Sequence, residues 1–206
     1  MNLPKPNGWP GSGRRRGRYK QPVNARQATR ESHENSILKD YTNWLRSKEL
    51  GEWKIDSQPD PPDGLLTCGG KFLWVELVGL YRNAKIAREI WSQATPGEKP
   101  YHHTLKRVSP TPLDDLSARI TNEVEKKLEK ASYKTFTEKY GPGTLIVSVQ
   151  DPLFNSKVDS VELEWILERF TGTHLESLKG KNNGKFGDLF LHEPGSPAKF
   201  HELCRF

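Results

Sequence analysis

The sequence predicts an α/β protein in which helices flank a mixed central β-sheet. Three features of the 206-residue chain carry this prediction. Residues 31–48 have apolar side chains at helical spacing, the pair Gly69-Gly70 separates two apolar runs, and residues 144–149 form a continuous apolar run. These patterns are typical of an amphipathic helix, a tight β-hairpin and a strand buried on both faces. A chain that combines them packs its helices against a sheet.

The first part of the predicted domain consists of one helix and three strands. The helix over 31–48 presents one apolar stripe and ends before Gly51. Residues 52–57 alternate apolar and polar side chains, as a short strand does, and the proline-rich residues 58–63 form a turn. Residues 64–68 and 71–77 are the two strands of the hairpin. The helical stripe consists of Ile37, Leu38, Tyr41, Trp44 and Leu45.

The second part adds helices, one buried strand and a final hairpin. We expect helices over 83–94, 113–133 and 159–170, with a loop over 95–112 between the first two. The buried strand over 144–149 precedes the last of these helices. A hairpin over 174–191 is predicted to turn at Asn182-Asn183-Gly184. We therefore expect a single domain over 31–193 and a C-terminal tail over 194–206.

The basic charge of the chain is concentrated at its N-terminus. Residues 1–30 carry eight Lys and Arg and no Asp or Glu, a charge of +8, whereas the rest carries 24 basic residues (32 less 8) against 26 acidic ones, a net charge of −2. A Gly-, Pro- and Arg-rich arm buries too little apolar surface to fold alone, so we expect disorder over 1–30. The arm is expected to contact nucleic-acid phosphates, or alternatively to act only as a solvated terminus. The residues expected to make these contacts are Arg14, Arg15, Arg16, Arg18 and Lys20.

The sequence predicts a cytoplasmic protein without a membrane segment. No apolar run is long enough to cross a bilayer, and the N-terminus lacks the apolar core of a secretory signal. The two cysteines, Cys68 and Cys204, are far apart in the chain. Neither a zinc site built on thiolates nor a disulfide framework is therefore expected.

The hairpin relates two carboxylates to each other. If Gly69-Gly70 is a two-residue loop, Cys68 pairs with Lys71, and stepping outward along both strands brings Asp63 opposite Glu76. Paired side chains point to the same face of a sheet, with Cβ atoms about 5 Å apart. Two like charges at this distance repel each other. A divalent cation relieves the repulsion because it takes several oxygen ligands.

Two structural alternatives compete with a metal site at this pair. A longer loop would shift the register, and water would screen two carboxylates at a frayed end of the hairpin. Glu76, however, lies in the otherwise apolar run of residues 72–78. A carboxylate in such a run is costly unless it is paired or bound to a metal. We therefore predict that Asp63 and Glu76 form the core of a divalent-metal site.

These residues resemble the PD-(D/E)XK nuclease superfamily. The resemblance rests on Pro62-Asp63, the hairpin, Glu76 on an apolar strand and a preceding helix that carries a glutamate. It covers residues 31–94, with the strand at 144–149 as a continuation. It implies a restriction-endonuclease-like core in which Asp63 and Glu76 bind Mg²⁺ or Mn²⁺. It also implies a lysine two residues beyond the second acid that positions or activates the attacking water.

The position of that lysine is occupied by Val78, so the basic group has to come from elsewhere. At about 100° per residue, Lys127 lies within roughly 40° of the centre of the apolar stripe of the helix over 113–133. A lysine there either extends to solvent or meets an anion, and Lys127 is the candidate for the displaced basic group. Glu34 lies on the apolar stripe of the first helix and fits the glutamate of the superfamily. The alternative for Glu34 is an interaction with the helix dipole.

The expected function is that of a metal-dependent nuclease that hydrolyses phosphodiester bonds in nucleic acid, with DNA favoured. The expected catalytic residues are Asp63, Glu76 and Lys127, and the expected ligands of Mg²⁺ or Mn²⁺ are Asp63, Glu76 and Glu34. The alternative is a nuclease fold without catalysis that binds nucleic acid or a protein partner, which is consistent with Val78.

Overall fold

A six-stranded mixed β-sheet forms the centre of the computed structural model, which describes residues 25–81, 84–102, 112–150, 164, 166–168 and 170–206. The strands are β1 (Lys54–Ser57), β2 (Gly64–Cys68), β3 (Lys71–Tyr81), β4 (Gly143–Gln150), β5 (Phe186–Glu193) and β6 (Lys199–Arg205). They lie in the sheet in the same order as in the chain. The pairs β3–β4 and β4–β5 are parallel, and the other three pairs are antiparallel. The α/β class and the mixed sheet that the sequence predicts are confirmed.

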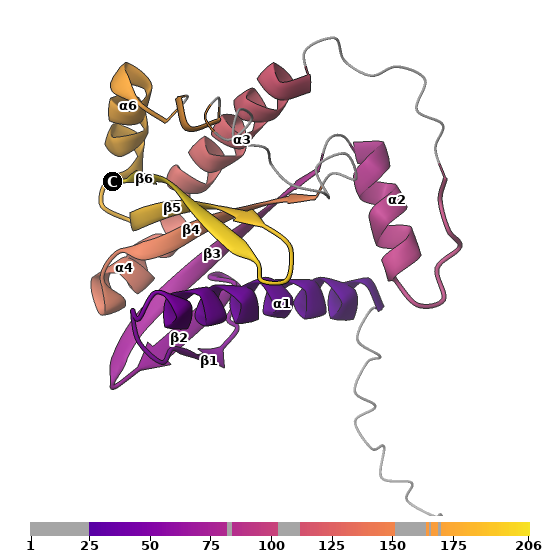
Figure 1. Ribbon diagram of the computed structural model, residues 1–206, viewed down its shortest axis with the longest axis horizontal. Helices are drawn as coiled ribbons and strands as arrows, with labels where there is room; N and C mark the ends of the chain where they lie inside the picture. Colours follow the sequence, from indigo (N-terminus) through magenta and orange to yellow (C-terminus); the bar gives the residue numbers. More distant parts are fainter. Residues whose placement is uncertain (1–24, 82–83, 103–111, 151–163, 165, 169) are drawn as a thin grey trace, which may run out of the picture.

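Helices cover both faces of this sheet (Figure 1). They are α1 (Ala25–Ser47), α2 (Ala84–Ala94), α3 (Pro112–Leu128), a 3₁₀ turn (Ala131–Tyr133), α4 (Lys134–Tyr140) and α6 (Gly172–Asn182). α1 packs on one face, whereas α3 and α6 pack on the opposite face. No helix in the described part of the chain is long and apolar enough to cross a membrane.

Two hydrophobic clusters, one on each face, hold these layers together. Below α3 and α6, the buried side chains of Ile120, Val124 and Leu178 meet Trp74 and Leu145 of the sheet. Below α1, an apolar stripe meets the other face of the strands. The stripe consists of Ile37, Leu38, Tyr41 and Leu45 of α1. In the sheet it contacts Val75, Leu77, Phe190 and Phe200, among others. Because side chains alternate along β3, Trp74 and Glu76 belong to the α3 face and Val75 and Leu77 to the α1 face.

An aromatic group joins α1 to the last two strands. The ring centroid of Tyr41 lies 5.1 Å from that of Phe200 on β6. The ring of Trp44 lies 5.2 Å from that of Phe190 on β5. The N-terminal helix is therefore packed against the most C-terminal strand of the sheet.

The hairpin between β2 and β3 has the predicted register. Cys68 pairs with Lys71, and the ladder continues to the pair Gly64 and Val75. Gly69 and Gly70 have φ angles of 55° and 79°. A type I′ turn needs positive φ at both central residues, and this explains why two glycines form the loop. The two-residue loop is confirmed, and the alternative of a longer loop is wrong.

The predicted buried strand is also confirmed as β4. Residues 144–149 are all buried, and β4 lies between the parallel strands β3 and β5. A strand in this position is covered by helices on both faces, so it carries apolar side chains on both.

The predicted hairpin over 174–191 is wrong. Residues 172–182 form the helix α6, and only the second half of the segment is a strand, β5. Asn183 ends the helix with a left-handed φ of 48°, and Gly184 follows with a φ of 71°. Asn and Gly adopt positive φ equally well in a hairpin turn and at the end of a helix, so the sequence signal was assigned to the wrong turn.

Several predicted boundaries also need correction. α1 begins at Ala25, inside the segment assigned to the arm, and β3 extends to Tyr81 instead of ending at 77. The helix predicted over 113–133 ends at Leu128 and is followed by the 3₁₀ turn and α4. Residues 199–205, assigned to a tail, form the edge strand β6, whose apolar side chains complete the core. Most of the helix predicted over 159–170 and residues 14–20 of the arm lie outside the described residues.

Candidate active site

Asp63 and Glu76 lie together where the ladder between β2 and β3 ends and β3 continues alone on that side. The ladder of β2 and β3 ends with Gly64 and Val75, one residue before the predicted pair. From Val75 to Tyr81, β3 pairs with β4 on its other side. Within the described part of the chain, no strand pairs with the β2-side edge of β3 beyond Val75. We refer to this edge, from Glu76 to Tyr81, as the free edge of β3.

The carboxylate of Asp63 caps this edge. Its Oδ2 atom accepts a hydrogen bond of 2.8 Å from the backbone N–H of Leu77. The Asp63 carboxylate thus takes the place of a backbone acceptor just beyond the end of the ladder between β2 and β3. Asp63 is 7% exposed, so the aspartate is held at the end of the strand with little contact to solvent.

Glu76 is buried more deeply, on the α3 face of β3. It is 3% exposed, and its Oε1 atom contacts the Nζ atom of Lys127 on α3. Its Oε2 atom is buried and has no hydrogen-bond partner within the described part of the chain. An unpartnered buried carboxylate oxygen is costly, and it is the kind of group that a bound cation would satisfy.

Asp63 lies in the electrostatic field of the Glu76 carboxylate. Burial, followed by the neighbouring Glu76 carboxylate, raises the pKa of Asp63 to about 7, although the hydrogen bond from Leu77 acts in the opposite direction. Two carboxylates in one low-dielectric site resist simultaneous ionisation. Burial and the same Glu76 carboxylate also raise the pKa of the Tyr133 hydroxyl. The Glu76 carboxylate therefore favours the protonated form of both neighbouring side chains.

The structure brings Lys127 to the pair as the sequence predicts. Its side chain leaves α3 toward the sheet and is 20% exposed, whereas that of its neighbour Lys126 is 66% exposed and binds Glu123. The apolar stripe of α3 is thus interrupted at Lys127 by a cation that meets a buried anion. Extension to solvent, the alternative for this residue, is not what the structure has.

Glu34 lies beside the site but is already paired. Its Oε1 atom accepts a hydrogen bond of 2.7 Å from Arg30, one turn earlier on α1. Arg30 also lies 3.7 Å from Oδ1 of Asp63. Within the described residues, no three His, Cys, Asp or Glu side chains are grouped so that they could hold a metal. The site therefore offers a cation two carboxylates, with Glu34 in an adjacent ion pair.

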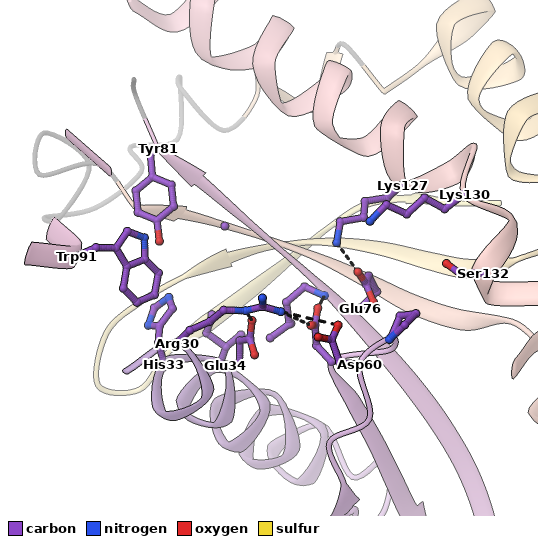
Figure 2. A pocket seen from close by; sticks show the side chains of 15 residues that line it. Arg30, His33, Glu34, Asp60, Glu76, Tyr81, Trp91, Lys127, Lys130 and Ser132 are labelled. Atoms are coloured by element: carbon purple, nitrogen blue, oxygen red, sulfur yellow. Dashed lines mark hydrogen bonds and ion pairs between the residues drawn. The ribbon is translucent and has the colours of Figure 1, made fainter. Parts of the chain in front are cut away.

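A cavity of about 610 Å³ surrounds the free edge of β3. Figure 2 shows Glu76, Lys127, Lys130 and Ser132 at one end of it and Tyr81, Trp91 and His33 at the other. Arg30 and Glu34 of α1 lie between the two ends, and Asp60 lies close to Glu76. The cavity is wide enough for a small ligand or a segment of a polymer.

Four residues of the cavity were not predicted from the sequence: Arg30, His33, Tyr81 and Trp91. Arg30 was assigned to the arm, although it precedes Glu34 by four residues and so lies on the same face of a helix that begins earlier. Tyr81 follows Leu77 and Gly79 at the two-residue spacing of a strand, which was expected to end at 77. No comparable signal in the sequence places His33 or Trp91 there.

Comparisons of the chain with protein-family models, curated proteins and solved structures found no significant match.

Proposed function

We propose that the protein is a metal-dependent nuclease that hydrolyses phosphodiester bonds in nucleic acid, with DNA as the favoured substrate. The observation that carries the proposal is the meeting of Asp63, Glu76 and Lys127 in one cavity, although they come from a loop, a strand and a distant helix. Phosphodiester hydrolysis needs a positioned water and stabilisation of negative charge, which acids and a cation together provide. The order of α1, the hairpin and the parallel pair β3–β4 supports a restriction-endonuclease-like core.

Asp63 and Glu76 would hold Mg²⁺ or Mn²⁺. The Oε2 atom of Glu76 and the Oδ1 atom of Asp63 would supply hard oxygen ligands. Mg²⁺ in particular is often held by only one or two carboxylates. Glu34 would complete the acidic surroundings if it exchanged its ion pair with Arg30. When bound, such a cation lowers the pKa of its water and neutralises charge on the phosphate.

Basic residues would divide the remaining tasks. The ammonium group of Lys127 would orient the attacking water or stabilise the charge that develops on the phosphate. Arg14, Arg15, Arg16, Arg18 and Lys20 would hold the polyanion near an otherwise acidic domain through phosphate contacts. These contacts add affinity without sequence preference.

A second candidate is a nuclease fold without catalysis that binds nucleic acid or a protein. Two observations favour it. Val78 occupies the position of the motif lysine, and Lys127 and Arg30 form ion pairs with Glu76 and Asp63. Binding without metal-dependent cleavage distinguishes this candidate from the first.

The test is cleavage of plasmid and single-stranded DNA by the full chain, with Mg²⁺, with Mn²⁺ and with EDTA. We expect cleavage only with a metal, and a loss of at least about 100-fold in Asp63→Asn and Glu76→Gln. Asp56→Asn is the matched control because Asp56 is an exposed aspartate on β1. Activity of both site variants close to that of the wild type would reject the assignment. DNA binding without any cleavage would support the second candidate.

A further inference from the structure

The end of the cavity opposite Lys127 is built from aromatic rings. The ring centroids of Tyr81 on β3 and Trp91 on α2 are 6.2 Å apart, and His33 on α1 meets Trp91 edge-on at 6.0 Å. All three side chains line the cavity and are only half-buried (Figure 2). Rings whose only task was to hold α2 against α1 would be covered. Part of their surface instead remains open to the cavity.

A glycine lies next to the Tyr81 ring at this end of the cavity. Gly79 lies on the α1 face of β3, between Leu77 and Tyr81, and lines the cavity. It is exposed, whereas its neighbours Val78 and Leu80 on the α3 face are buried. A Cβ atom at this position would lie 3.4 Å from the Tyr81 ring. The missing side chain therefore lets the Tyr81 ring lie close to the backbone of the free edge.

The backbone at this position also offers polar contacts. The N–H of Leu77 points to the free edge of β3, where it meets Asp63. Alternate residues of a strand direct their N–H and C=O groups to the same edge. Those of Gly79 therefore point to the free edge, one step along the strand from the carboxylates. The backbone donor and acceptor match the polar edge of a nucleobase, and the aromatic ring matches its flat face.

We propose that Tyr81, Trp91, His33 and the free edge at Gly79 form a subsite for an unpaired nucleobase, so that the nuclease acts on single-stranded DNA or on unpaired ends. This inference rests on the proposed function and specifies its substrate. Bases stack on aromatic side chains with little sequence preference. A base within a duplex would first have to leave its stack, at a cost in free energy. The scissile phosphate then lies toward Asp63, Glu76 and Lys127.

The test uses the full chain carrying Glu76→Gln, which blocks cleavage, and fluorescence anisotropy with labelled DNA. Single-stranded DNA is compared with a duplex of the same sequence at about 150 mM salt, because arm contacts to phosphate depend on salt and occur with both. We expect single-stranded DNA to bind at least about fivefold more tightly than the duplex, and Trp91→Leu to remove that preference. Trp53→Leu is the matched control, because Trp53 is half-buried near β1 and does not line the cavity.

A second variant avoids dependence on the tryptophan. Gly79→Val places methyl groups against the Tyr81 ring and suits a strand, so it should displace that ring and abolish the preference. Oligonucleotides with one abasic position provide a third measurement. One such position should weaken binding at least about fivefold, and Trp91→Leu should be insensitive to it.

The outcomes separate the subsite from the proposed function. Equal affinity for both DNA forms, together with no effect of Trp91→Leu, Gly79→Val or an abasic position, overturns the subsite. If Glu76→Gln nevertheless abolishes metal-dependent cleavage, the nuclease proposal stands without it. If Glu76→Gln cleaves like the wild type, the proposed function fails whatever the strand preference.

Discussion

The ammonium group of Lys127 contacts the carboxylate of Glu76, and this ion pair links α3 to the central strand β3. It compensates a buried charge that would otherwise destabilise the sheet. It also places a cation next to the two acids. The contact therefore joins a structural task and a proposed catalytic one in a single residue.

Lys127→Met should separate these two tasks. We expect cleavage to fall about 100-fold, as for loss of a group that assists proton transfer or charge stabilisation. Binding of Mn²⁺ should persist, because the lysine contacts Oε1 of Glu76 whereas the metal would use Oε2. The measurements are single-turnover cleavage and isothermal titration with Mn²⁺. Lys126→Met is the matched control, one residue earlier and exposed, and it should stay within about twofold of the wild type. Equal losses of cleavage activity in both variants would contradict the proposed catalytic role of Lys127.

Asp63→Asn should stabilise the metal-free protein while abolishing its proposed activity. The pKa of Asp63 is raised to about 7, above its unfolded value of 3.8, so the folded protein holds the proton more tightly. Stability of the wild type therefore falls as pH rises from about 4 to 7 and stays lower above that range. At pH 8 in EDTA, we expect the variant to be more stable by about 2 kcal/mol. Urea unfolding at pH 4 and pH 8 checks this, and a gain that does not grow with pH would contradict it.

His192 should destabilise the fold on acidification. It is 3% exposed, its Nδ1 atom lies 3.0 Å from the hydroxyl of Ser148, and its Nε2 atom lies 3.6 Å from Asp40 on α1. Burial and then His33 lower the pKa of His192 to about 4, although Glu193 opposes them. The unfolded chain binds the proton from about pH 6.5, so stability is present above that pH and is lost as pH falls toward 4.

The expected loss through His192 is about 2 kcal/mol at pH 5 relative to pH 7. Because Asp63 acts with the opposite sign over an overlapping range, the wild-type curve alone does not isolate the histidine. The measurement is the difference in unfolding free energy between the wild type and His192→Asn as a function of pH. We expect the variant to become more stable relative to the wild type as the pH falls below 6.5. A difference in unfolding free energy that does not change with pH would contradict the prediction.

Gly143→Ala should destabilise the start of β4. A Cβ atom there would overlap the indole ring of Trp74, which is fully buried and stacked with Tyr133. We expect a loss of about 1–3 kcal/mol, since the ring has no room to move. Gly180→Ala is the control, because a Cβ atom at this position in the last turn of α6 meets nothing within 4 Å. It should add about 0.5–1 kcal/mol of stability through helix propensity. Thermal unfolding of both variants checks the contrast.

The elements that could be predicted from the sequence are those with local chemical causes. Gly69-Gly70 defines its own turn and therefore the register that ends with Gly64 and Val75, the residues next to Asp63 and Glu76. The apolar run of β4 needs no partner to be read as a buried strand. β6 has no such signature, because its side chains alternate irregularly around the bulge opposite Leu189 and Phe190. The signal at Asn183 is ambiguous, because a left-handed residue serves helix ends and hairpins alike.

The candidate site could be predicted where one element sets the geometry. The carboxylate pair comes from a single hairpin, and Lys127 could be placed because helix rotation fixes its side of α3. The aromatic end of the cavity combines β3, α2 and α1, and the distance between these elements depends on tertiary packing. Helix and strand periodicity contain no information about that distance.

The packing of α1 on Phe190 and Phe200 has a consequence for synthesis of the protein. The helix emerges from the ribosome long before β5 and β6, whose Phe190 and Phe200 contact Tyr41 and Trp44. Until β5 and β6 have been translated, a nascent chain therefore presents Tyr41 and Trp44 to water and to other proteins. Any chaperone that assists this protein has its binding window between the emergence of α1 and the arrival of Phe200.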